Sequence, residues 1–259
     1  MDTHEFGGST GEIVVGSLLE RFGERAEAPI AEERLPFTIR VVRSDAQLEK
    51  AVFMRRSAYA RHVPALAERL RVPEPYDYDE GSVVLLAESK LDESPLGTMR
   101  IQTNRYRRLA IEQSVRLPDW LRERSLAEAT RLGIAEGRAG RLVKTMLFKA
   151  FFHYCRDAGI DWLVIGARPP LDRQYAALLF HDVIQGGALI PLRHAGDIPH
   201  RIMAFEIEAA EARWIEANHP LYDLFCRTRH PDIELDDGRG LLRRPNARSA
   251  RLQQVDAGL

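Results

Sequence analysis

The chain has 259 residues, of which 45% are hydrophobic and 29% charged, and its formal net charge at pH 7 is -1. This length is enough for one large domain with a hydrophobic core and some extensions, and the balanced charge does not indicate nucleic-acid binding. No apolar run approaches the roughly 18 residues of a membrane span, and the first residues lack the basic and apolar parts of a signal peptide. We therefore expect a cytoplasmic protein without a transmembrane segment.

The cysteine and histidine patterns indicate neither disulfides nor metal. Cys155 and Cys226 are far apart and form no C-x-x-C pattern, which is typical of a protein from a reducing compartment. The eight histidines show no ligand spacing, so we predict no metal site.

The N-terminal half alternates between strand and helix signals. Residues 1–35 mix glycine with charge and predict a partly flexible arm. A strand is expected over 37–44, and Asp45 is predicted to cap the helix that follows through residue 60. Residues 82–89 and 95–104 have strand patterns, and the short polar segment between them predicts a hairpin.

The middle of the chain contains the clearest helix signal. Residues 105–125 show no clean period and predict loop and short helix, whereas 126–134 alternate as a strand. A long helix is expected over 137–159, with Gly140 near its start and Gly159 at its end. A strand over 160–167 and a helix over 170–182, opened by Pro170, should follow.

The last segments complete the expected architecture. We predict strands at 188–193 and 201–208, then a helical extension over 209–235, with a break near Pro220, and a disordered tail over 236–259. The pattern indicates an α/β (α+β) fold of three layers, with a mixed, mostly antiparallel central sheet and flanking helices. The core is expected over 36–208.

The most informative stretch is the strand over 126–134, because it contains a carboxylate on an apolar face. Alternation should place on one face Leu126, Glu128, Thr130, Leu132 and Ile134, with Arg131 on the other. Burying an ionised group costs several kcal/mol unless it is paired or its pKa rises, and these conditions make a useful proton acceptor. The alternative is a structural glutamate at the sheet rim, neutralised by an arginine.

The order of the charged residues resembles that of known enzymes. The predicted helix contains Arg55 with the aromatic Tyr59 four positions on, and the acidic loop after it contains Asp79. A G-x-x-R strand then contains Gly97 and Arg100, and an E-x-x-R strand contains Glu128 and Arg131. This order resembles the acyl-homoserine lactone autoinducer synthases and, more closely, the N-acyl amino acid synthases, both long-chain acyl branches of the GNAT acyltransferase superfamily. The resemblance covers residues 36–208 and implies a GNAT-like fold.

The departures from the autoinducer synthases concern the acceptor. Those enzymes have a tryptophan ten residues after the helix arginine, where this chain has Ala65, and their loop carboxylates are spaced D-x-x-D, whereas here Tyr76 takes the first place and Asp77 comes one position later. The resemblance therefore implies an amino acid or another small amine as acceptor, rather than S-adenosylmethionine. In these families the helix arginine, here Arg55, belongs to the acceptor side or orders the N-terminal lid.

Acyl transfer from a thioester to an amine needs a base, oxyanion stabilisation and a departing thiol. Glu128, directly or through one water, is the candidate base. Backbone N–H groups around 132–135 are expected to stabilise the oxyanion. Tyr175 lies where many GNAT enzymes keep a tyrosine that can protonate the thiol, although it could equally pack on the sheet.

Two arginines have two possible roles. Arg100 and Arg131 could clamp the carboxylate of an amino acid acceptor, since a guanidinium group binds a carboxylate bidentately. Alternatively, they hold Glu128 and Asp79 in a structural network. Both roles are compatible with the sequence.

The donor site is predicted at the start of the long helix. Gly137, Arg138, Gly140 and Arg141 lack the spacing of a full pyrophosphate-binding loop but would fit the single phosphate of a carrier-protein phosphopantetheine arm. Nearby cations could bind an acidic acyl carrier protein or could form a solvated helix face: Arg105, Arg107, Arg108, Arg138, Arg141, Lys144 and Lys149. The apolar residues of this helix are expected to be core, in part beside a tunnel for the acyl chain.

The resemblance implies an N-acyltransferase that moves a long-chain acyl group from an acyl carrier protein to the amine of an amino acid or similar small amine. We expect no bound cofactor, because the acyl-phosphopantetheine thioester, on carrier protein or CoA, is a substrate. Three alternatives remain: an autoinducer synthase, an acetyl-CoA-dependent N-acetyltransferase and a non-catalytic acyl-binding module.

Overall fold

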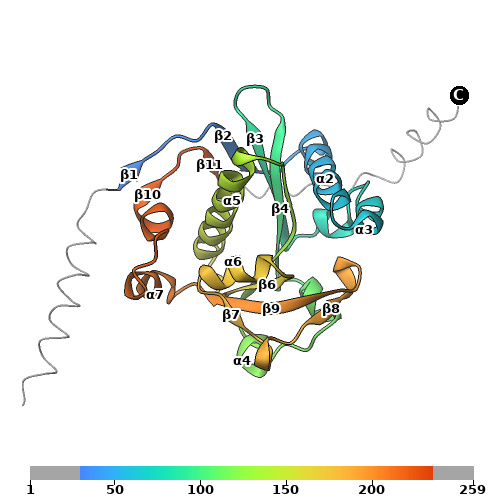
Figure 1. The fold of residues 1–259 in the computed structure, drawn as a ribbon, viewed down its shortest axis with the longest axis vertical. Coiled ribbons are helices and arrows are strands. Elements are labelled where there is room, and N and C mark those ends of the chain that lie inside the picture. The colour runs from blue at the N-terminus through green and yellow to red at the C-terminus, as the bar shows by residue number, and fades with distance from the viewer. Residues whose placement is uncertain (1–29, 236–259) are drawn as a thin grey trace, which may run out of the picture.

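The computed structural model describes residues 30–235 (Figure 1). Most of the predicted N-terminal arm and the predicted tail over 236–259 lie outside the described residues. Among the described helices, none is long and apolar enough to span a membrane.

A nine-stranded sheet forms the centre of the fold. Its main path runs through β11 (Ile233–Glu234), β2 (Phe37–Val41), β3 (Ser82–Ser89), β4 (Pro95–Thr103), β5 (Leu126–Ile134), β6 (Trp162–Ala167), β9 (Ile198–Glu206) and β7 (His181–Asp182). The additional strand β8 (Ile190–Leu192) pairs with β9. Within this nine-stranded sheet of residues 30–235, the β11–β2 and β5–β6 pairs are parallel and the others antiparallel, so the predicted mixed, mostly antiparallel sheet is confirmed.

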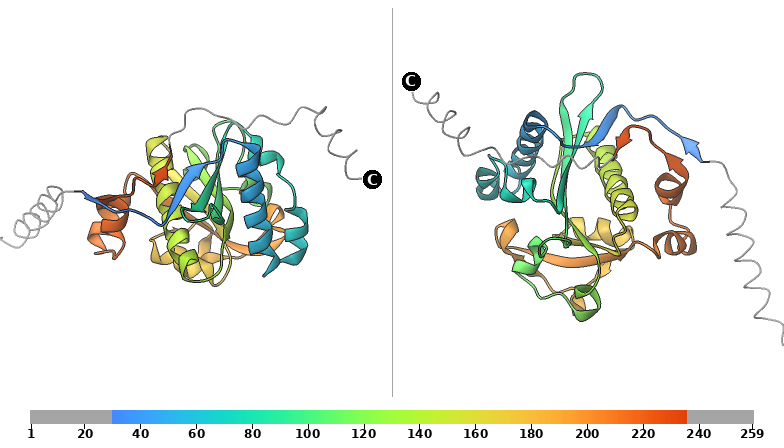
Figure 2. Two further views of the ribbon diagram at one scale, coloured as in Figure 1. Left: turned by 90° about the horizontal axis from the view of Figure 1, so that it is seen from above. Right: turned by 180° about the vertical axis from the view of Figure 1, so that it is seen from behind.

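Helices cover both faces of this sheet, which gives three layers (Figure 2). On one face lie α2 (Asp45–Ala60) and α3 (Pro64–Arg69), and on the other lies α5 (Arg138–Asp157). The shorter helical elements are η1 (Pro75–Tyr78), η2 (Ala110–Gln113), α4 (Asp119–Arg122), α6 (Leu171–Ala177), η3 (Gln185–Gly187), η4 (Arg193–Ala195), α7 (Ala210–Glu216) and η5 (Asp223–Arg227).

Several element boundaries differ from the sequence prediction. Ser44, not Asp45, caps α2, because the Ser44 side chain accepts a hydrogen bond from the N–H of Gln47 at 3.3 Å. Asp45 is the first residue of the helix itself. The helix predicted to reach residue 182 ends at Ala177, and the chain then turns into β7. The break expected near Pro220 is confirmed, since α7 and η5 are separate.

The long helix α5 packs tightly on the sheet. A side chain at Gly97 of β4 would place its Cβ 2.6 Å from the Val143 side chain, so this glycine permits the close approach of helix and strand. Phe151 and Met146 of α5 are fully buried in the main core.

Lys149 fastens the C-terminal segment to α5. Its Nζ donates hydrogen bonds to the carbonyl oxygens of Leu224, at 2.6 Å, and Thr228, and lies 2.9 Å from His230 Nδ1. The segment that contains Thr228 forms β10 (Thr228–Arg229), which pairs in parallel with β1 (Ala31–Glu32). Of the cations predicted to face a carrier protein, Lys149 is therefore a buried structural group.

Candidate functional site

The site lies where two parallel strands separate. Residues 126–129 of β5 pair with 162–165 of β6, and beyond them β5 continues with β4 as its only paired neighbour. The two strands diverge from this point. A cavity of about 360 Å³ occupies the space between the diverging ends.

A bulge in β5 changes which residues share a face. The β4–β5 register shifts between Thr98 and Arg100, and Arg131 has a φ of 55°, a left-handed conformation. Residues 126, 128 and 130 therefore share a face with Arg131, so the prediction that Arg131 points to the opposite face is wrong. The predicted places of Leu132 and Ile134 are wrong for the same reason, because both now pack with the core on the α5 side.

Glu128 is buried and only partly hydrogen-bonded. Its Oε2 accepts the N–H of Ile111 at 3.0 Å, whereas Oε1 has no hydrogen-bond partner among residues 30–235. Burial raises the pKa of Glu128 to about 7, although the Ile111 amide and the charges of Arg100 and Arg131 oppose this shift. A carboxyl group with such a pKa exchanges its proton near neutral pH, as a general base requires.

A histidine that the sequence did not single out lies beside this carboxylate. His194 Nε2 is 3.5 Å from Glu128 Oε1. Burial, then the charges of Arg131 and Arg100, lower the pKa of His194 to about 4, so the ring is neutral at pH 7. Arg131 Nη2 donates to the backbone oxygen of His194 at 2.9 Å and so fixes η4 against β5. No sequence pattern marks this residue, because it lies in the short helical turn η4.

Three buried arginines meet two carboxylates behind Glu128. Asp77 lies 2.8 Å from Arg55 Nη1 and 3.3 Å from Arg100 Nη1. Glu74 accepts two hydrogen bonds from Arg131, at 2.6 and 2.7 Å, and one from Arg100 at 3.1 Å. The alternative of a structural network is therefore present, with Glu74 and Asp77 as its carboxylates.

These charges keep both carboxylates ionised. Burial raises the pKa of Glu74, but the hydrogen bonds and charge of Arg131, with the other two arginines, outweigh it and bring the pKa to about 2. Burial acts in the same way on Asp77, and the charges of Arg55 and Arg100 hold its pKa below the ordinary value.

The acidic loop presents its carboxylates three residues apart. Glu74 and Asp77 form the sequence E-x-x-D, which reproduces the D-x-x-D spacing of the resembled families with glutamate in the first place. The sequence comparison had taken Asp79 as the second carboxylate, but Asp79 instead pairs with Arg107 away from the cluster. Glu74 could have been found by testing glutamate as well as aspartate at that spacing.

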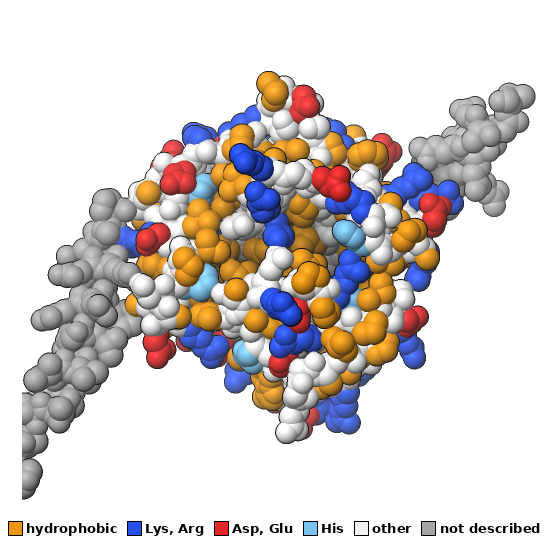
Figure 3. All heavy atoms as spheres, in the orientation of Figure 1, with side chains coloured by type: hydrophobic (Ala, Val, Ile, Leu, Met, Phe, Trp, Pro, Cys, Tyr) orange, Lys and Arg blue, Asp and Glu red, His pale blue; other side chains and the backbone are white. Residues whose placement is uncertain are grey.

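The cavity brings together most, but not all, of the predicted site residues. Those that line it are Tyr59, Glu128, Arg131, Gly137, Gly140, Arg141 and Tyr175. Arg55 and Arg100 are completely buried in the charge cluster behind it, and neither Asp79 nor Arg138 contributes to the lining. In Figure 3, hydrophobic side chains surround a hollow near the middle of this face, and Lys and Arg side chains lie beside it.

Tyr175 closes one wall of the cavity. Its ring packs edge-on against Phe148, with the centroids 5.1 Å apart, so it contributes to the core as the alternative interpretation held. Burial, together with the nearby Tyr59, raises the pKa of Tyr175 above its ordinary value. The phenol therefore stays protonated at neutral pH and has a proton to donate.

The N-terminus of α5 reaches the same cavity. Gly137 precedes the helix with a φ of 92°, and a Cβ at Gly140 would lie 2.1 Å from the backbone oxygen of Ala135. The missing side chains let the backbone turn tightly at the start of the helix. Together with Arg141 and Lys144 in the lining, this end of the helix can bind an anion such as a phosphate.

The free edge of β5 offers backbone donors. Ala135 donates its N–H to Leu96 of the β4 side at 2.9 Å. Since N–H directions alternate along a strand, those of Leu132 and Ile134 are directed away from β4, toward the edge from which β6 has separated. This is the geometry needed for an oxyanion at the cavity wall.

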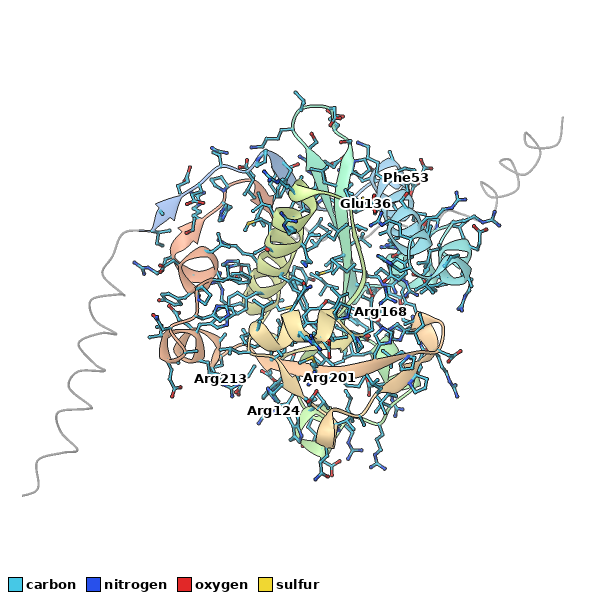
Figure 4. All side chains as sticks on the ribbon, in the orientation of Figure 1. Phe53, Arg124, Glu136, Arg168, Arg201 and Arg213 are labelled. Atoms are coloured by element: carbon cyan, nitrogen blue, oxygen red, sulfur yellow. The ribbon has the colours of Figure 1, made fainter. Side chains whose placement is uncertain are left out.

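Arg168 supplies a cation that the sequence analysis did not consider. It lies just beyond the end of β6 and lines the cavity (Figure 4). Within residues 30–235, its guanidinium group makes no ion pair or side-chain hydrogen bond. It is thus available to an anionic ligand, whereas Arg131 is already occupied by Glu74 and His194.

Comparison with known proteins identifies the family of the chain. The family model described as N-acyl amino acid synthase FeeM matches residues 46–192, more than half of the chain. A search of curated proteins finds no match. The solved structure of FeeM, an N-acyl amino acid synthase from uncultured soil microbes, is similar with a TM-score of 0.54 and 18% identity, covering 70% of this chain and 96% of that one.

Two other solved structures are more distant. BjaI, a CoA-dependent acyl-homoserine lactone synthase solved with SAM and isopentyl-CoA, has a TM-score of 0.49 and 16% identity, over 75% of this chain and 93% of that one. A putative GNAT-family acetyltransferase from Desulfovibrio desulfuricans has a TM-score of 0.47 and 17% identity, over 66% and 99%. The chain shares the fold of the FeeM structure, and the predicted resemblance to the N-acyl amino acid synthases is confirmed. The chain belongs to the FeeM family of N-acyl amino acid synthases and is an acyltransferase.

Proposed function

We propose that this enzyme moves a long-chain acyl group from the thioester of an acyl carrier protein to the amine of an amino acid. The observation that supports the proposal is the buried carboxyl of Glu128 at the wall of the cavity between β5 and β6, because burial raises its pKa to about 7 and so suits it to accept a proton near neutral pH. A binding module without catalysis would have no need of this costly group.

The reaction uses three parts of the cavity. Glu128 accepts a proton from the attacking amine, a role worth about 10² to 10⁴ in rate. The N–H groups of Leu132 and Ile134 stabilise the oxyanion on the thioester carbon, where one donor is typically worth about 10² to 10³. Tyr175 returns a proton to the departing thiol.

The acceptor is proposed to be a carboxylate-bearing amine. Arg168 has no ion-pair partner among the described residues and lines the same cavity as Glu128, so it can bind a carboxylate while the amine faces the base. Arg100 and Arg131 support the site from behind through Glu74 and Asp77. Replacing Arg168 with methionine should raise KM for an amino acid but leave KM for the matching amino alcohol unchanged.

The donor is proposed to enter at the N-terminus of α5. Gly137, Gly140 and Arg141 would bind the single phosphate of a phosphopantetheine arm, and the cations around them would attract an acidic carrier protein. Burying ten methylenes of an acyl chain is worth a gross ~8 kcal/mol, which favours a long chain in a cavity with apolar walls. The two cysteines are free thiols, which agrees with a reaction in the cytoplasm.

One observation favours a second candidate, an autoinducer synthase. The E-x-x-D spacing of Glu74 and Asp77 removes one of the two departures from those enzymes, whereas Ala65 still stands in place of their tryptophan. Presenting S-adenosylmethionine and a mixture of amino acids as acceptors to the same donor separates the two candidates.

The proposed reaction can be measured by mass spectrometry of the products. Purified enzyme would receive acyl carrier thioesters of increasing chain length, the matching acyl-CoA molecules or acetyl-CoA, each with a mixture of amino acids. N-acyl amino acids formed fastest from a long-chain carrier thioester would support the proposal. Acetylation from acetyl-CoA, with the carrier thioesters ignored, would overturn the donor assignment.

A further inference from the structure

The most unusual pair of groups in the cavity is the carboxylate of Glu128 and the imidazole of His194. Glu128 Oε1 and His194 Nδ1 are both buried without a hydrogen-bond partner in the described part of the chain. Such unsatisfied groups are uncommon in native structures, and a catalytic role is one explanation for them.

The two groups differ in their access to the cavity. The side chain of Glu128 is 0% exposed, whereas that of His194 is 9% exposed, and both line the cavity wall. The Nε2 atom of His194 faces the unpartnered Oε1 of Glu128 at 3.5 Å, a separation that catalytic pairs commonly show before substrate binds. Resting on the proposed function, we propose that His194 is a catalytic residue that relays a proton from the acceptor amine to Glu128.

Two contacts support the ring in this place. Arg131 bonds the backbone oxygen of His194, and the N–H of Arg193 donates to Ser114 Oγ at 2.9 Å, so η4 is held from both sides. His194 also lies just outside the region matched by the family model, which ends at residue 192.

The proposed proton transfer starts at the acceptor. Because His194 Nδ1 is buried before substrate binds, the ring must tilt toward the cavity for the ammonium group to lose a proton to Nδ1, while the Nε2 proton passes to Glu128 Oε1. The freed lone pair of the amine forms the C–N bond at the thioester carbon, and the C–S bond breaks. The sulfur takes the second proton from the nitrogen through Tyr175. Before the next turnover Glu128 returns its proton to His194 Nε2 while Nδ1 releases its proton to solvent, which restores the starting form of the ring.

The charged surroundings favour this direction of transfer. The groups that face the pair are Arg100 from β4, Arg131 from β5, His200 from β9 and the amides of Ala110 and Ile111 from η2. Burial and the positive charges of Arg131 and Arg100 disfavour an imidazolium ion, and burial raises the proton affinity of Glu128, so the ring passes a proton on rather than keeping it.

The test compares the His194→Gln variant with the wild-type enzyme, both with an amino acid as acceptor. The glutamine amide can donate to Glu128 but cannot relay a proton, so we expect kcat/KM to fall about 100-fold or more, with KM for the donor unchanged. The wild-type rate should level off above about pH 7, where Glu128 is ionised, whereas the rate of the variant should keep rising at higher pH with the free-amine fraction of the acceptor. His181→Gln is the control, because His181 stacks on Trp120 outside the cavity.

A second acceptor separates the relay from a structural role. Methoxyamine is already neutral at pH 7, so it should react with wild type and His194→Gln at similar rates. His194→Asn and thermal melting provide a check if the glutamine variant is poorly folded. The relay would be refuted by amino acid transfer in His194→Gln at the wild-type rate, or by an equal loss with both acceptors in a folded variant. Failure of the wild-type enzyme to acylate amino acids would refute the proposed function instead.

Discussion

Replacing Glu128 with glutamine should make the protein more stable and less active, and the gain in stability should depend on pH. Burial raises the pKa of Glu128 from the ordinary 4.5 to about 7, so the folded state binds this proton more tightly than the unfolded state. The stabilisation is fully present below pH 4.5 and is lost as the pH rises through 7. At about 1.4 kcal/mol per pH unit, the whole effect is about 3 kcal/mol.

Glutamine does not titrate, so Glu128→Gln should match wild type near pH 4 and exceed it by up to about 3 kcal/mol at pH 8. Its amide oxygen can still accept the Ile111 N–H, which limits other changes. For a protein of this size, the expected rise in Tm at pH 8 is about 6 to 12 °C. His194 titrates with the opposite sign, since its lowered pKa removes stability as the pH falls from 6.5 toward 4, but both proteins keep this residue.

Urea unfolding at a series of pH values measures this difference directly. Glu123→Gln is a matched control, because Glu123 is exposed after α4 and should change stability little at any pH. If the difference in unfolding free energy between Glu128→Gln and wild type were the same at pH 5 and pH 8, the carboxyl of Glu128 would not be buried as described. The reasoning about its basicity would then fail as well.

Other substitutions test the surroundings of the site. Asp77→Asn should lower the free energy of unfolding in urea by about 3 to 5 kcal/mol, because Arg55 and Arg100 would remain buried with less neutralising charge; a loss no larger than that of the exposed Asp92→Asn would contradict the cluster. Gly140→Ala should cost about 1 to 3 kcal/mol in thermal melts through its clash with Ala135, and an unchanged Tm would refute the tight turn. Lys149→Met would leave the carbonyl groups of Leu224 and Thr228 without this donor, which should destabilise the C-terminal segment by about 1 to 3 kcal/mol and speed its proteolysis. Resistance to proteolysis equal to that of the wild type would refute this anchoring.

The sequence was sufficient for the layers and for the buried carboxylate of β5. Alternation in β3, β4 and β5 and the long apolar face of α5 are local patterns, and they predicted those elements within a few residues. Glu128 stood out because a carboxylate on an apolar strand face needs an explanation, and its predicted burial is confirmed, whereas its role as the base stays a prediction.

The failures arose where backbone geometry or distant segments decide the outcome. A bulge at Arg131 reverses the faces of β5, and strict alternation cannot anticipate an inserted residue. Glu74 and His194 reach the site from a loop and a short helical turn, where no periodicity marks them. The assignment of Asp79 depended on comparing residue types one by one, whereas the fold selects the carboxylates that can reach the arginines.

Production of lipids by living cells tests the central claim most directly. A bacterial host would express wild-type protein or Glu128→Gln to equal levels, and intact-mass analysis would follow new lipids in the medium. We predict long-chain N-acyl amino acids from the wild type and their loss from the variant. An unchanged yield from Glu128→Gln would remove this carboxyl from the chemistry and contradict the account.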